Sequence, residues 1–319
     1  MLTLKDIKAT RETLPKEVVR TPLLFSDELS KQFNGHVFLK TENLQVAGSY
    51  KSRAAFHILN SLSQEQKQKG AAISSSGNFA SAFAFMGSLL GVSTSIVMME
   101  STAPFKVQRT QSYGGEVVVC DNRFEARWET LDKLQEQGIT TINTFESPEV
   151  IMGHGTIGLE ILEDNPEIDM ILVPISSGGL LAGVSLVAKE MKPDVKIVGV
   201  QPEGSNAMYR SFHAGSLQKI ERIDTICDAL VSTKPGALPF QYVQKYVDDV
   251  VLVSEDAVKT AVGLLFEKTK LVVEPSGAVG IAALHSDAVS AKNKNVAVLL
   301  SGGNVSRETF ISILKHLSP

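Results

Sequence analysis

The chain has 319 residues, of which 43% are hydrophobic and 21% are charged, and its formal net charge is -4. This composition is typical of a globular protein with a core large enough for about two domains. The chain has no basic stripe, no apolar run long enough to span a membrane and no apolar segment of a secretory signal in its charged start, so we expect neither a nucleic-acid nor a membrane partner.

Short apolar segments alternate with amphipathic ones along the first half of the chain. The sequence predicts strands at residues 36–42, 71–74, 93–99 and 115–120. Between them it predicts helices at residues 52–62, 79–91, 105–113 and 123–138. Gly138 marks the end of the last of these helices, as glycines often do.

The second half continues the alternation, with strands predicted at residues 170–175, 196–202, 249–254 and 295–303. Apolar strands that alternate with helices are typical of mostly parallel sheets covered on both faces. The predicted fold class is therefore α/β. We assign residues 70–146 to a small domain, and residues 1–69 with 147–319 to a large domain.

The segment SSSGN at residues 74–78 joins a predicted strand to a predicted helix. Ligands of open α/β sheets bind beyond the carboxyl ends of strands, and free N–H groups at a helix N-terminus attract anions. Ser and Asn are also preferred N-cap residues, so a purely structural role stays open. Three serines and an asparagine nevertheless exceed what a cap needs, which indicates an anion site.

The segment SSGG at residues 176–179 follows another apolar strand, and Leu180 begins a helix. Consecutive small residues let backbone N–H groups converge on a phosphate. A tight turn is the structural alternative, and the lysine of a nucleoside triphosphate P-loop is missing. A third strand ends at Ser301, whose hydroxyl is followed by two glycines that permit close approach of a ligand.

The segment GHGTIG at residues 153–158 matches the glycine pattern of dinucleotide-binding sites. That pattern requires a preceding strand and an acidic residue about 20 positions later, and this chain has neither. We expect instead that Gly153 and Gly155 let a helix start close to another element. A nicotinamide-dependent oxidoreductase therefore remains only a distant alternative.

Lys51 lies between a Gly-Ser turn and the helix predicted at residues 52–62. A lysine does not stabilise this position, because the first turn of a helix carries partial positive charge. Partial burial and the helix N-terminus both disfavour the ammonium form, which leaves a nucleophilic amine suited to Schiff-base chemistry. Pyridoxal 5′-phosphate is the cofactor that offers an aldehyde to a lysine and a phosphate to a glycine-rich segment.

Several motifs occur in a fixed order along nearly the whole chain: RTPLLFS (20–26), FLKTENLQVAGSYKSRAA (38–55), SSSGNFASA (74–82), GHGTIG (153–158), PISSGGLLAG (174–183), VVEPSGAVG (272–280) and LLSGGN (299–304). In these motifs the sequence resembles the serine/threonine dehydratase and serine racemase group of the fold type II, or tryptophan-synthase-β-like, pyridoxal-phosphate enzymes. The resemblance implies two open, mostly parallel sheets with helices on both faces. It also implies a cofactor in the cleft between a larger and a smaller domain.

The resemblance further implies roles for single residues. Lys51 would bind the cofactor covalently, and Lys51 and Ser76 would be the catalytic residues. Tyr50 would lie against the cofactor ring, Asn78 would hydrogen-bond its 3′-oxygen and Ser301 would face its nitrogen. Two further sets hold the charged groups: the cofactor phosphate would bind Ser176, Ser177, Gly178, Gly179 and Leu180, and the substrate carboxylate would bind Ser75, Ser76 and Asn78.

These roles imply an ammonia-lyase that dehydrates and deaminates a β-hydroxy amino acid of the L-threonine or L-serine type. Because Ser301 replaces an acid opposite the ring nitrogen, the ring stays neutral, which favours loss of a β-hydroxyl group. An amino-acid (serine) racemase that uses Lys51 and Ser76 as two opposed acid/bases is the alternative within the group. A cofactor carrier without catalysis is a third reading, which the intact Lys51 and Ser76 disfavour.

The sequence departs from the group at a few positions. Racemase-type members hold a divalent cation (Mg or Ca) through acidic residues, whereas this chain has Gln201, Ser205 and Ala207 at the matching positions, so the metal ligands are unknown. We expect no regulatory domain after the SGGN segment. We also expect a cytoplasmic protein, since Cys120 and Cys227 have neither disulfide-framework nor metal-site spacing. The resemblance implies a homodimer.

Overall fold

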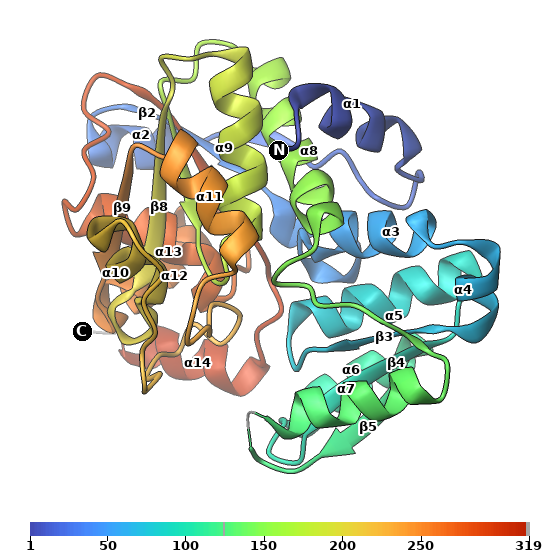
Figure 1. The fold of residues 1–319 in the computed structure, drawn as a ribbon. Helices are drawn as coiled ribbons and strands as arrows, with labels where there is room; N and C mark the ends of the chain where they lie inside the picture. The colour runs from blue at the N-terminus through green and yellow to red at the C-terminus, as the bar shows by residue number, and fades with distance from the viewer. Residues whose placement is uncertain (124, 317–319) are drawn as a thin grey trace.

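The structure is a computed structural model that describes residues 1–123 and 125–316. The chain forms two sheets, each with helices on both faces (Figure 1). The α/β class and the mostly parallel sheets are therefore confirmed. Within these residues, no helix combines the length and the apolar character needed to cross a membrane.

The larger sheet has six strands in the order β1-β2-β10-β7-β8-β9. Its strands are β1 (Leu23–Phe25), β2 (His36–Lys40), β7 (Met170–Pro174), β8 (Lys196–Pro202), β9 (Asp249–Val253) and β10 (Asn295–Leu299). Strand β1 pairs antiparallel with β2, and the other neighbours are parallel. This sheet joins the start of the chain to its second half.

Alternating side chains of these strands supply two separate cores. Leu172 packs with α2 (Asp27–Phe33), α12 (Glu255–Thr269) and α13 (Pro275–His285) on one face. Its neighbours Ile171 and Val173 pack on the other face with α8 (Pro148–Asp164), α9 (Gly179–Met191) and α11 (Ala237–Tyr246). Because successive side chains of a strand point to opposite faces, a continuous apolar strand is needed to fill both cores.

The smaller sheet has four parallel strands in the order β5-β4-β3-β6. They are β3 (Ala71–Ser74), β4 (Thr94–Met99), β5 (Glu116–Cys120) and β6 (Thr140–Thr141). Helices α3 (Lys51–Ser61) and α5 (Asn78–Leu90) pack on one face, and α7 (Ala126–Glu136) packs on the other. All four strands lie within residues 70–146, while the exact domain boundaries stay a prediction.

The remaining helices lie around these two layers. They are α1 (Leu4–Thr13), α4 (Gln64–Lys69), α6 (Pro104–Ser112), α10 (Ala207–Ala214) and α14 (Arg307–His316), and short 3-10 turns occur at Glu42–Leu44, Val46–Gly48 and Glu203–Ser205. Helix α1 packs against α8 through Ile7, which is fully buried. Helices α1 and α2 and strand β1 were not among the predicted elements.

Helix α8 corrects one expectation. It begins at Pro148 behind the N-cap Ser147, so Gly153 and Gly155 lie inside the helix and not at its start. The close approach was expected correctly, because a Cβ on Gly153 would lie 2.6 Å from Ala54 Cα, and one on Gly183 would lie 2.4 Å from Ile151 O. Helix α8 thus packs tightly between α3 and α9. Because GHGTIG is helical, it does not form the strand-to-helix turn of a dinucleotide site.

Candidate active site

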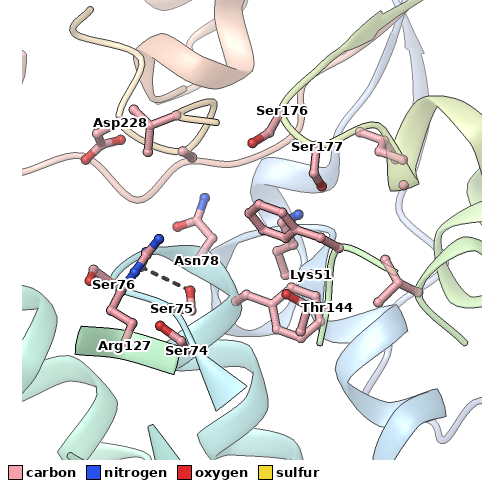
Figure 2. A pocket seen from close by; sticks show the side chains of 18 of the residues that line it. Lys51, Ser74, Ser75, Ser76, Asn78, Arg127, Thr144, Ser176, Ser177 and Asp228 are labelled. Carbon is pink, nitrogen blue, oxygen red and sulfur yellow. Dashed lines mark hydrogen bonds between the residues drawn. The ribbon is translucent and has the colours of Figure 1, made fainter. Parts of the chain in front are cut away.

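A cavity of about 440 Å³ opens where the carboxyl ends of β3 and β7 approach the start of α3 (Figure 2). The cavity is lined by the loops that follow both strands, by the start of α3 and by residues of α6, α7 and α8. Among its lining residues are Lys51, Ser75, Ser76, Asn78, Arg127, Thr144, His154, Ser176 and Ser177. Segments far apart in the sequence therefore meet in one cavity, which several polar side chains line.

Lys51 is the first residue of α3, and its amine lies between two aromatic rings. The Nζ atom is 4.4 Å from the ring centroid of Tyr50 and 5.4 Å from that of Phe79. Among the described residues, no carboxylate forms an ion pair with it. Burial lowers the pKa of Lys51 to about 7, although the charge of Glu274 opposes the shift. The side chain is therefore a neutral amine in a large fraction of molecules near neutral pH.

The backbone before Lys51 is held in an unusual conformation. Ala47 and Gly48 both have positive φ angles, of 56° and 73°. Tyr50, which precedes the lysine, makes no side-chain cap; its backbone N–H donates to Ser301 O at 3.2 Å. The hydroxyl of Ser52 donates to Val46 O at 2.6 Å. These bonds fix the first turn of α3 without an acidic cap that would pair with the lysine.

Two residues after Lys51, Arg53 anchors the same turn in a buried ionic network. Its guanidinium donates to both carboxylate oxygens of Glu42 at 3.0 and 2.8 Å, and to those of Glu160 at 2.7 and 2.8 Å. Lys40 completes the network through a 2.6 Å bond to Glu160. All four side chains are at most 4% exposed, and their formal charges cancel. Helix α3 is thereby tied to β2 and α8.

The loop between β7 and α9 presents a helix N-terminus to the cavity. Gly178 has a φ angle of 110°, and a Cβ there would lie 2.5 Å from Met208 Cε. The first N–H to bond within the helix is that of Ala182, which donates to Gly178 O. The N–H groups of the preceding positions are therefore the free donors of this helix end, together with the hydroxyls of Ser176 and Ser177. This arrangement suits a phosphate.

The loop between β3 and α5 leads to a second helix N-terminus at the cavity. Helix α5 has Gly77 as its N-cap and receives no side-chain capping bond. Ser75 accepts a long 3.4 Å bond from Gly77 N, and Ser76 accepts one from the Thr102 hydroxyl at 3.2 Å. The structural alternative, in which these serines cap the helix, is thus not observed. Their hydroxyls line the cavity instead.

Asn78 is held by two residues that the sequence analysis gave no role. Its Nδ2 donates to Glu274 Oε1 at 2.6 Å, and its Oδ1 accepts from Asn304 Nδ2 at 2.7 Å. Glu274 also accepts from the backbone N–H of Asn304 at 3.1 Å. Burial, with a smaller contribution from Asp228, raises the pKa of Glu274 to about 8. The orientation of the Asn78 amide is therefore fixed before any ligand binds.

Most of the predicted site residues lie together. The cavity is lined by Tyr50, Lys51, Ser75, Ser76, Asn78, Ser176, Ser177, Gly178, Gly179 and Leu180. Ser301 is not among these lining residues; its hydroxyl is 3.5 Å from Ser276 O, and its carbonyl receives the N–H of Tyr50. Phe79 also lines the cavity, whereas Met208 and Phe240 pack in the core. The roles of all these residues stay predictions.

Sequence reasoning also missed His154, which lines the cavity from α8. Its ring is fully buried and lies 4.6 Å from the ring of Tyr50. His154 lies within the GHGTIG segment, but only the glycines of that segment were interpreted. No cluster of three or more His, Cys, Asp or Glu side chains in the described ranges could hold a metal ion.

Residues 14–302 match the protein family described as pyridoxal-phosphate dependent enzyme. The L-threonine ammonia-lyase of Thermotoga maritima is 40% identical, over 96% of this chain and 76% of its own length. Maize serine racemase superposes with a TM-score of 0.93 at 36% identity, covering 99% of this chain and 98% of its own. The processed form of threonine deaminase isoform 2 from Solanum lycopersicum also has a TM-score of 0.93, at 31% identity, covering 99% of this chain and 94% of its own.

Proposed function

Because the chain belongs to the family of pyridoxal-phosphate-dependent enzymes, we propose that it is an ammonia-lyase for a β-hydroxy amino acid of the L-threonine or L-serine type. The products are a 2-oxo acid and ammonia. One observation carries the proposal: a half-buried lysine with a depressed pKa and no carboxylate partner in the described chain lies in the same cavity as the free start of α9. The names of the similar proteins, such as L-threonine ammonia-lyase, support the proposed reaction class.

The cavity residues fit the cofactor in charge and donor set. An amine with a pKa of about 7 is available to react with an aldehyde. The N–H groups at the start of α9 need an acceptor, and Ser176 and Ser177 supply two further hydroxyls. Lys51 would therefore hold the cofactor covalently, and residues 176–180 would hold its phosphate. Tyr50 and Asn78 would contact its ring.

The bound cofactor supplies an electron sink for the charge that develops at the substrate Cα. The chain supplies the base: once the amino group of the substrate has replaced Lys51 on the cofactor, the freed amine of Lys51 would accept the proton from Cα, which requires its neutral form. Its depressed pKa gives a substantial neutral fraction near pH 7. The aromatic rings of Tyr50 and Phe79 flank the amine.

The start of α5 positions the substrate. The hydroxyls of Ser75 and Ser76 and the free N–H groups of the helix form a site for the substrate carboxylate. Because Asn78 is already held by Glu274 and Asn304, this end of the cavity needs little reorganisation. The carboxylate would be fixed on the small-sheet side while the amine of Lys51 approaches Cα from the start of α3.

The direct test is to incubate the purified protein with the cofactor and with L-threonine, L-serine, D-serine or 3-hydroxyaspartate, and to measure 2-oxo acid and ammonia. We expect both products in equal amounts from an L-β-hydroxy amino acid. Lys51→Ala removes the base and should abolish the reaction. Product formation by Lys51→Ala at the wild-type rate would contradict the proposal.

Racemisation of the same substrates is a second candidate, which the position of Ser76 favours. Figure 2 shows Lys51 and Ser76 on separate elements, with Asn78 between them in this view. The Ser76 hydroxyl lines the cavity and accepts from Thr102, so it could return a proton to Cα. Ser76→Ala is expected to lose any racemisation and to keep dehydration of the L-enantiomer. Equal loss of both activities would exclude this role.

Three further points complete the proposal. We place the enzyme in the cytoplasm, because both Cys120 and Cys227 are buried free thiols. We propose a homodimer, which sedimentation of the purified protein would test. A divalent cation stays a proposal without assigned ligands, and addition of Mg²⁺ or Ca²⁺ with measurement of thermal stability would test it.

A further inference from the structure

His154 is a buried polar side chain that the proposed reaction does not use. It is 0% exposed, and neither ring nitrogen has a hydrogen-bond partner among the described residues. A buried polar group without a partner is costly, so such groups are rare and call for an explanation. A ligand that supplies the missing partner is one such explanation.

The surroundings of His154 show which part of the cavity it faces. The tight packing of α8 against α9 places Nδ1 3.8 Å from the position of a Cβ on Gly179, the first residue of α9. On its other side, the imidazole ring lies 4.6 Å from the ring of Tyr50. His154 therefore lies between the start of α9 and the residue before Lys51.

The charge state of the imidazole follows from the same surroundings. Burial holds the pKa of His154 well below its usual range, and the charges of Lys51 and Arg53 act in the same direction. The ring is therefore neutral, with one nitrogen that donates and one that accepts. Within the described residues no carboxylate bonds either ring nitrogen, so none favours an imidazolium.

We propose that His154 is a phosphate-binding residue, whose Nδ1–H donates a hydrogen bond to the phosphate of the bound cofactor beside Gly179. The bond supplements the backbone N–H groups of α9 from the side of α8. It also satisfies a donor that is otherwise buried without an acceptor. The assignment rests on the proposed use of pyridoxal 5′-phosphate and adds a residue to it.

The purely structural alternative is that the ring only packs against Tyr50. The two possibilities differ in the chemistry they require. Packing needs an aromatic ring, which phenylalanine supplies, whereas phosphate binding needs an N–H group, which glutamine supplies. His154→Phe and His154→Gln therefore separate the two roles.

The experiment measures the equilibrium affinity of the full-length apoprotein for pyridoxal 5′-phosphate and for pyridoxal, which lacks the phosphate. A hydrogen bond to a charged group accounts for about a tenfold to hundredfold change in affinity. We expect His154→Phe to bind pyridoxal 5′-phosphate with an affinity lower by that factor and to bind pyridoxal with the wild-type affinity. His154→Gln should keep most of the affinity for both. His57→Phe is the matched control, because His57 lies in α3 and contacts Thr10 outside the cavity.

Unchanged affinity of His154→Phe for pyridoxal 5′-phosphate would overturn the assignment, and so would an equal loss for both ligands. A second measurement needs no variant: in wild-type protein labelled with ¹⁵N-histidine, pyridoxal 5′-phosphate but not pyridoxal should shift a histidine N–H resonance. Absence of that shift would also overturn it. If the wild-type protein binds no pyridoxal 5′-phosphate, the proposed function fails first, which is a distinguishable result.

Discussion

Replacing Arg53 with methionine removes one charge from the buried network but keeps a long apolar side chain. In the wild-type protein, Lys40 and Arg53 balance Glu42 and Glu160, and all four side chains are nearly inaccessible to solvent. Arg53→Met leaves one buried carboxylate without a counter-charge. Breaking a buried pair in this way costs about 3–5 kcal/mol. This is a large part of the roughly 5–15 kcal/mol that stabilises a typical protein.

Urea denaturation of the apoprotein at constant pH measures this effect. Fluorescence of Trp128, the one tryptophan of the chain, and circular dichroism should give coincident transitions, which justifies a two-state free energy. We expect a lower midpoint with an unchanged m value. The control is Arg20→Met, since Arg20 pairs with Glu163 and Asp164 but has a 48% exposed side chain. Such exposed pairs contribute about 0–1 kcal/mol.

A loss of less than about 1 kcal/mol in Arg53→Met, or a loss no larger than that of Arg20→Met, would show that the buried charges do not stabilise the protein in this way. Either result would mean that the network relaxes or admits water when the arginine is removed. A large loss would instead confirm that α3, and with it Lys51, is anchored by buried charge.

Three further predictions concern the cavity. Gly178→Ala should lose at least about 1–2 kcal/mol in urea denaturation, because its φ angle of 110° disfavours a side chain and the new Cβ would meet Met208; unchanged stability would contradict this. The rate at which Lys51 of the apoprotein is acylated can be measured by mass spectrometry of its peptide at a series of pH values. The rate should reach half its maximum near pH 7, since burial lowers the pKa of Lys51 to about 7. A midpoint near pH 10 would show an ordinary lysine. Glu274 has a pKa raised from 4.5 to about 8, so its stabilising contribution is complete below pH 4.5 and is lost as the pH rises through 8. The stability of Glu274→Gln relative to wild type should therefore increase as the pH rises from 5 to 8. A difference in urea midpoint between the two proteins that stays constant over this range would contradict the raised pKa of Glu274.

The fold was predictable where local pattern decides structure. Strands β3 and β8 were predicted with their observed bounds, because each is a short apolar run between turn residues. Helix α8 was harder to read, since Pro148 and three internal glycines resemble a loop. Those glycines are explained only by tertiary contacts, in which backbone atoms of α3 and α9 occupy the space of a side chain.

In the candidate site, too, some residues could be predicted from local sequence and others only from tertiary contacts. Lys51 and the segments at residues 74–78 and 176–180 are recognisable because small residues at strand ends are a local signal. Glu274 and Asn304 contact Asn78 from 196 and 226 residues away, so no local pattern reveals them. His154 was hidden for another reason: its importance follows from two unpartnered nitrogens, which only coordinates can show.

Chemical trapping shows whether Lys51 carries the cofactor. The purified protein is incubated with pyridoxal 5′-phosphate, reduced with borohydride, digested and analysed by mass spectrometry. Lys106 is an internal control, because it also lines the cavity but is paired with Asp228 at 2.6 Å. We predict a phosphopyridoxyl group on the peptide that contains Lys51, absent from Lys51→Ala. No label at all, or a label on Lys106 with Lys51 unmodified, would contradict the account.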